Sequence, residues 1–92
     1  MAKSILQREK ECYLCGRKTC LERHHIFAGI ANRKISEREG FWAYLCHDCH
    51  TGVEGAQYNK ASNRYLKEQA QMAYEETHTR EEFMRLIGKN YL

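Results

Sequence analysis

The pattern of apolar and polar positions divides the chain into a strand-forming first part and a helical second part. Residues 20–27, CLERHHIF, roughly alternate between apolar and polar side chains and end on two good strand formers. Residues 41–46, FWAYLC, are aromatic and apolar. The pattern predicts two short strands that pair with each other and pack one face against the elements that follow.

The rest of the first part shows no clear period. Residues 1–11 are polar and predict a short helix or a frayed arm. The segment from Ala28 to Gly40 contains a glycine near each end, is rich in charge and has no sustained period. We therefore expect a long loop there, and a loop of that length in a small domain is usually functional or mobile.

The second part is helical in its pattern. From Tyr58 onward, apolar residues recur at helical spacing, and the chain contains no proline. This predicts a main helix from about residue 57 to about residue 77. Gly52 and Gly55 interrupt its start, so we expect a helical turn over Asp48–Thr51 to be separate from it.

A second, shorter helix is predicted near the end of the chain. Thr79 and Glu82 have the spacing of a capping box, which places a helix over roughly residues 80–87. A glycine follows the last residue of that stretch and ends the helix. We expect Tyr91 or Leu92 to dock on the domain.

Length and composition narrow the class of protein. A chain of 92 residues makes one small domain, residues 1–92, and a domain of this size often needs a disulfide or a metal to fold stably. No apolar run approaches the roughly 20 residues of a membrane span. The N-terminal stretch has no apolar core of signal-peptide length. These features predict a cytoplasmic protein without membrane association.

Four of the five cysteines form two Cys-x-x-Cys pairs, Cys12 with Cys15 and Cys46 with Cys49. Each pair presents two thiolates from one tight turn, and in the cytosol such pairs favour a metal over disulfides. The sequence therefore predicts a structural Zn²⁺, with Cys20 as the spare thiol. Metal binding of this kind contributes on the order of 10 kcal/mol to folding.

The histidines are the candidates for further chemistry. His24 and His25 are adjacent on a predicted strand, so their side chains point to opposite faces unless the strand ends or bulges there. His50 directly follows the second cysteine pair, where a neutral imidazole can ligate a divalent cation. We expect His47 to be exposed or hydrogen-bonded, and His78 to be structural.

The charge is unevenly distributed. The net charge is +3, and the excess of basic residues flanks the histidine pair. One interpretation is contact with a phosphate backbone, and the other is an ordinary solvated loop. The basic residues of this stretch are Arg17, Lys18, Arg23, Arg33, Lys34 and Arg38.

The order of these motifs resembles the HNH endonucleases of the ββα-metal class, and most closely small HNH proteins encoded by bacteriophages. The segments that carry the resemblance are LERHHIFAGIANRK, WAYLC running into Cys-x-x-Cys-His, and THTREEFMRLIGKNYL, so that it covers nearly the whole chain. The resemblance implies an α+β fold: a small, zinc-stapled, treble-clef-like ββα-metal core over about residues 10–58, with C-terminal helices over about residues 58–92.

The resemblance also implies roles for individual residues. The first histidine of the family's pair, here His24, is a ligand of the catalytic metal, and the second, here His25, is the general base that activates water. The histidine after the second cysteine pair, here His50, is another metal ligand. The four paired cysteines hold the structural zinc. A further histidine of the family has Glu54 or Gln57 near its place here, and Glu54 could ligate a hard cation through oxygen.

The family's central asparagine is missing from its usual place. It normally opens the second strand, where this chain has Phe41 or Trp42. Asn32 in the predicted loop or Asn59 in the main helix could take over its role. We count Asn59 among the predicted catalytic residues.

These features together predict a metal-dependent endonuclease that hydrolyses DNA phosphodiester bonds. Its catalytic cation would be Mg²⁺, Mn²⁺, Ni²⁺ or a second Zn²⁺. DNA is the expected partner, with a homodimer or a phage protein as further possible partners and the host cytoplasm as the location. Two alternatives are a zinc-stapled DNA-binding module without catalysis and a treble-clef-like module that binds proteins. The residues expected to hold the DNA backbone are Arg23, Arg33, Lys34 and Arg38.

Overall fold

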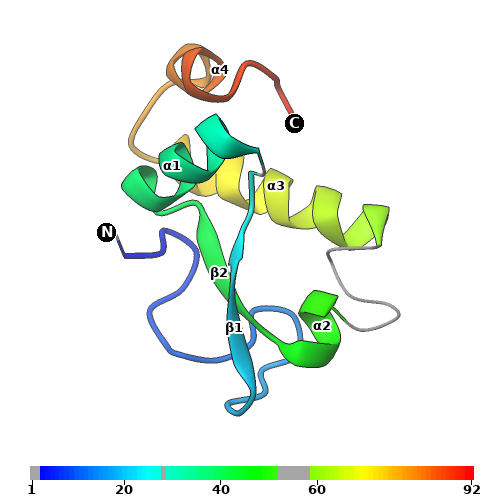
Figure 1. The fold of residues 1–92 in the computed structure, drawn as a ribbon. Helices are drawn as coiled ribbons and strands as arrows, with labels where there is room; N and C mark the ends of the chain where they lie inside the picture. Colours follow the sequence, from blue (N-terminus) through cyan, green and yellow to red (C-terminus); the bar gives the residue numbers. More distant parts are fainter. Residues whose placement is uncertain (1–2, 28, 52–58) are drawn as a thin grey trace.

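The computed structural model of the chain describes residues 3–27, 29–51 and 59–92, and within them it forms a small α+β structure with one two-stranded sheet and four helices. In Figure 1 the two strands run side by side through the middle of the molecule. Three helices gather around one end of the strands, and the short helix α2 lies at the other end. The elements are β1 (Leu21–His25), α1 (Ile30–Glu39), β2 (Trp42–Cys46), α2 (His47–Thr51), α3 (Lys60–Tyr74) and α4 (Arg80–Ile87).

The two strands pair with each other, which confirms the predicted pairing of the two apolar segments, and they run antiparallel. Leu21 lies opposite Cys46, and His25 lies opposite Trp42. This register brings the end of β2, with the second cysteine pair, to the start of β1. It therefore fixes the histidines of β1 relative to α2.

The loop predicted between the strands is wrong, because residues Ile30–Glu39 form the helix α1. The helix ends at Gly40, whose left-handed φ of 80° suits a C-cap. Ser36 is buried, and its hydroxyl donates a hydrogen bond to the Phe27 carbonyl at 3.2 Å. The helix presents few apolar residues to the core, so its sequence carries only a weak helical period.

Residues 3–11 contain no helix or strand and form the arm that was one of the two predictions for this segment. The arm runs along the outer edge of β2. The Ser4 hydroxyl donates to the Trp42 carbonyl at 2.5 Å, and Gln7 Oε1 accepts from the Tyr44 N–H at 2.6 Å. A Cβ at position 40 would collide with the Lys3 carbonyl oxygen, so only glycine allows this close approach.

The core is built from aromatic side chains that join the sheet to the last two helices. The rings of Phe27, Phe41 and Phe83 meet edge to face, with centroids 5.2 to 6.0 Å apart. Such pairs contribute about 0.5–1.5 kcal/mol each beyond their area burial. Leu66 of α3 is fully buried in the same cluster. The sheet therefore depends on α3 and α4 for much of its hydrophobic support.

The predicted C-terminal helices are confirmed, with a shorter α3 than expected. Asn59 is its N-cap, and its side chain accepts a hydrogen bond from the Ser62 N–H at 3.1 Å. Thr79 and Glu82 make both hydrogen bonds of a capping box at the start of α4. None of the helices in the described ranges combines the length and the apolar character needed to cross a bilayer.

Candidate metal centre and histidine pair

The two Cys-x-x-Cys pairs come together in space. One Sγ atom from each of the four cysteines lies within 4.8 Å of the other three, and the Cys15 and Cys46 sulfurs are 3.6 Å apart. Around a tetrahedral zinc with Zn–S bonds of about 2.3 Å, the sulfurs would be about 3.8 Å apart. The four cysteines are therefore positioned to hold a metal ion, consistent with the predicted structural zinc.

Local structure presents each pair. The first pair lies in a turn closed by a hydrogen bond from the Gly16 N–H to the Cys12 carbonyl at 2.8 Å, with Gly16 at a left-handed φ of 81°. The Tyr13 N–H donates to the Tyr44 carbonyl at 2.8 Å, which ties this turn to β2. The second pair spans the last residue of β2 and the middle of α2. Cys20 is exposed and lies outside the cluster, as predicted.

The thiols of the cluster strongly influence one another. Burial tends to raise the pKa of Cys12, but hydrogen bonds with the backbone of Cys46, Cys15 and Leu14 lower that pKa to about 7. Burial raises the pKa of Cys49 strongly, and hydrogen bonds with the neighbouring cysteines add to the shift. Four thiolates this close repel one another, so full ionisation of the cluster requires a cation between them.

His24 has the most unusual environment of the histidines. It is 7% exposed, and its Nε2 is buried without a hydrogen-bond partner among the residues that the structure describes. Its ring centroid lies 5.1 Å from that of His50. Burial lowers the pKa of His24 to about 4, with smaller contributions from His50, His25 and Lys67. His24 is therefore a neutral imidazole with a partnerless nitrogen, which a ligand would satisfy.

Glu22 forms a hydrogen bond with His50, the histidine whose ring contacts His24. Its Oε1 lies 2.8 Å from His50 Nδ1, and its Oε2 lies 3.2 Å from Nδ1 of the exposed His47. These hydrogen bonds lower the pKa of Glu22, so the carboxylate is the acceptor and the histidine Nδ1–H groups donate. The proton on Nδ1 leaves the lone pair of His50 on Nε2, the arrangement that second-shell carboxylates impose on metal-binding histidines.

Sequence reasoning missed Glu22, although a signal was present. Residues two apart on a strand share a face, so Glu22 and His24 lie on the same face of β1. The antiparallel register then brings His50 beside that face. The period of the strand was sufficient to suggest Glu22, but its partner depended on the register.

His25 occupies the last position of β1 and makes a different contact. Its Nε2 lies 3.0 Å from Oε1 of Glu37 on α1, and the carboxylate accepts this hydrogen bond. Glu37 was missed because its segment was predicted to be a loop. Adjacent residues of a strand point to opposite faces unless the strand ends there, and β1 ends at His25. His24 and His25 can therefore serve one site.

The candidates for the central asparagine lie on two different helices. Asn59 caps α3 through its side chain, and Asn32 is half-buried on α1. Phe41 and Trp42 hold the family's usual place for this residue and are buried, at 0% and 6% exposed. The other two candidate ligands, at positions 54 and 57, lie outside the described residues.

The basic residues predicted to contact DNA spread over β1 and α1. The Arg23 guanidinium carbon lies 4.0 Å from the centroid of the Trp42 ring. Arg33 and Lys34 are exposed on α1, and Arg38 pairs with the neighbouring Glu39 at 3.0 Å. Three of the four therefore project from a helix instead of the predicted loop.

No protein-family model, curated protein or solved structure matches the chain. The fold and the site define a small α+β domain with four cysteines positioned to hold a metal ion. Beside the cysteines lies a pair of histidines in contact, one buried and one held by a carboxylate.

Proposed function

We propose that this protein is a metal-dependent endonuclease of the HNH type, which hydrolyses DNA phosphodiester bonds. The observation that carries the proposal is the buried, neutral His24, which is in ring contact with His50 and whose Nε2 has no hydrogen-bond partner in the described ranges. The order of cysteine pairs and histidines along the chain resembles that family. The α+β arrangement, with two antiparallel strands and a helix that begins directly after Cys46, supports a ββα-metal core.

In this proposal, His24 and His50 bind the catalytic cation through their Nε2 atoms. A divalent cation there would stabilise negative charge on the scissile phosphate and on the leaving oxygen. Glu22 keeps the proton of His50 on Nδ1 and so keeps Nε2 available. Imidazole ligands suit Zn²⁺ and Ni²⁺ better than Mg²⁺ and Mn²⁺, which prefer oxygen, and cleavage assays with each cation distinguish them.

His25 acts as the general base. Its Nε2 donates to Glu37, so the lone pair of the neutral ring lies on Nδ1, which accepts the proton of the attacking water. The Glu37 carboxylate orients the ring and stabilises the imidazolium that forms, as the carboxylate does in a serine protease triad. Glu37 is thus a positioning residue for the base.

A second candidate function is a zinc-stapled DNA-binding module without catalysis. Buried Phe41 and Trp42 at the place of the family's central asparagine favour this alternative. Metal content separates the two functions. Two metal ions per chain support the nuclease, whereas one ion, held by the cysteines, supports the binding module.

The deciding experiment is plasmid nicking by the zinc-loaded protein with Mg²⁺, Mn²⁺, Ni²⁺ or added Zn²⁺. His25→Ala should lower the nicking rate by roughly a hundredfold to ten-thousandfold while circular dichroism and DNA affinity stay unchanged. The matched control is His78→Ala, because His78 is exposed and stacks on Tyr74 of α3. Nicking by His25→Ala at the wild-type rate would remove the base assignment.

A further inference from the structure

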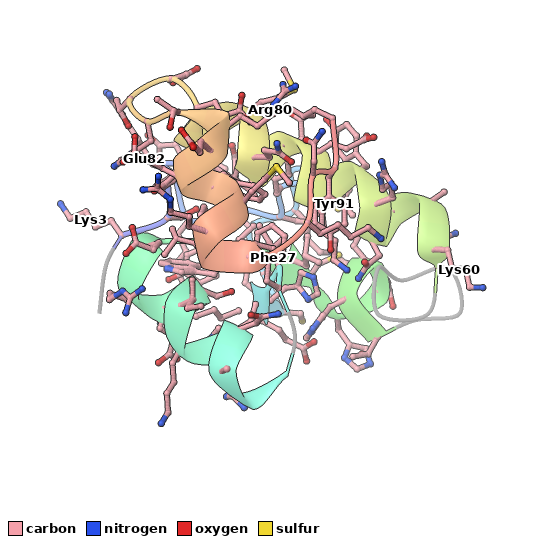
Figure 2. All side chains as sticks on the ribbon, turned by 90° about the horizontal axis from the view of Figure 1, so that it is seen from above. Lys3, Phe27, Lys60, Arg80, Glu82 and Tyr91 are labelled. Atoms are coloured by element: carbon pink, nitrogen blue, oxygen red, sulfur yellow. The ribbon has the colours of Figure 1, made fainter. Side chains whose placement is uncertain are left out.

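Three basic side chains surround one aromatic ring near the C-terminus. The Arg64 guanidinium and the Lys67 ammonium on α3 both lie 5.4 Å from the centroid of the Tyr91 ring. The Lys89 ammonium, on the tail that follows α4, lies 5.2 Å from the same centroid. We call these three residues the Tyr91 cluster. Figure 2 shows the tail with Tyr91 running beside α3.

The ring is held in a fixed position. Gln71 of α3 is fully buried; its Oε1 accepts from the Tyr91 N–H, and its Nε2 donates to Asn90 Oδ1, both at 2.7 Å. Arg64 donates to the Tyr91 carbonyl at 2.9 Å. The ring itself packs against Phe27, with centroids 5.7 Å apart. The cluster is therefore built by hydrogen bonds and core contacts that do not depend on a ligand.

The positive charges of the cluster are poorly compensated. Arg64 pairs with Glu68 at 3.3 Å, but no carboxylate in the described part of the chain pairs with Lys67 or Lys89. Burial lowers the pKa of Lys67, and the nearby charges of Lys89 and Arg64 lower it further. Cation–π contacts return only about 0.5–1 kcal/mol each at exposed sites. An anion bound among the three groups would relieve their mutual repulsion.

The cluster lies close to the histidine pair. The Tyr91 ring packs against Phe27, with centroids 5.7 Å apart, and Phe27 lies two residues beyond His25, the last residue of β1. A polyanion that occupies the cluster therefore extends toward the histidines.

We propose that the Tyr91 cluster binds the backbone phosphates of a nucleic-acid strand and delivers that strand to the His24–His50 pair. The delivery to a cleavage site rests on the proposed function, whereas phosphate binding by the cluster does not. Lysine binds phosphate as a point charge, whereas arginine can donate two hydrogen bonds to it at once. Because the cations crowd around the Tyr91 ring, we expect contact with the backbone and no reading of base sequence.

The test is the affinity of the zinc-loaded protein for a fluorescent DNA duplex, measured over a range of salt concentrations without a catalytic cation. The double variant Lys67→Gln with Lys89→Gln should raise Kd on the order of tenfold and lower the slope of log affinity against log salt by about two. The charge-keeping variant Lys67→Arg with Lys89→Arg should bind like the wild type. The matched control, Lys10→Gln with Arg85→Gln, removes two exposed charges elsewhere and should also bind like the wild type.

Several results would overturn the inference: wild-type affinity in the glutamine variant, an equal loss in the control, an equal loss in the arginine variant, or no binding by the wild-type protein. Cleavage assays separate this inference from the proposed function. If the protein binds DNA through the cluster but does not nick DNA with any of the cations tested, phosphate binding by the cluster stands and the nuclease proposal is refuted. A nuclease whose KM is the same with and without Lys67 and Lys89 would keep the proposed function and refute the cluster.

Discussion

Lowering the pH should destabilise this protein through His24. The ordinary pKa of histidine is 6.5, and burial holds the pKa of His24 at about 4 in the folded state. The unfolded chain therefore takes up a proton below pH 6.5 that the folded chain does not accept. Stability is complete above pH 6.5 and declines as the pH falls toward 4.

The size of this effect follows from the shift. Each unit of pKa difference corresponds to 1.36 kcal/mol, so burial of His24 costs about 3 kcal/mol of stability once the pH has fallen to 4. Small domains have only about 5–15 kcal/mol of stability in total. Because protonation of the paired cysteines would release a bound metal ion at low pH, the contribution of His24 must be measured by difference.

Two measurements isolate it. Histidine ring resonances followed by nuclear magnetic resonance should show His24 neutral through pH 6.5 and titrating near pH 4. Urea unfolding of wild type and His24→Leu should give free energies whose difference is constant above pH 6.5, with the wild type losing up to about 3 kcal/mol more on acidification. Titration of His24 at pH 6.5, or unfolding curves whose difference is independent of pH, would refute the reasoning.

Two further predictions concern stability. Cys46→Ser should leave the chain largely unfolded, because a structural zinc contributes on the order of 10 kcal/mol; far-ultraviolet circular dichroism and metal content check this, and a cooperative melt near that of wild type would contradict a structural zinc. Gln71→Ala removes the buried amide that fixes the tail and should lower the free energy of unfolding by about 2–4 kcal/mol, measured by urea denaturation. An unchanged denaturation midpoint would show that the tail is held by its ring contacts alone.

The features with local signals could be read from the sequence. The cysteine spacing predicted the cluster of four cysteines that could hold a metal ion, the aromatic segment predicted β2, and the capping box predicted the start of α4. In each case the chemistry of a few neighbouring residues determines the structure. The helix α1 was not predicted, because its sequence carries only a weak helical period. Its contact with the core is made in part by a polar residue, Ser36, which is fully buried.

Contacts between distant segments could not be predicted from the sequence. The pairing of His25 with Glu37 requires α1 to be a helix, and the Tyr91 cluster requires Gln71 to hold the tail against α3. The C-terminal third of the chain is close to neutral, so its net charge gave no hint of a basic surface there. Tertiary packing concentrates charges that the sequence spreads over 26 positions, from Arg64 to Lys89.

The arm that borders β2 also occupies hydrogen-bonding groups on the edge of the sheet. The Trp42 carbonyl and the Tyr44 N–H are satisfied by Ser4 and Gln7 side chains, where another strand would otherwise attach. A protein shortened past Gln7 would present that backbone to its neighbours as a template for further β-pairing. A segment that has no regular structure of its own thus covers the sheet edge at Trp42 and Tyr44.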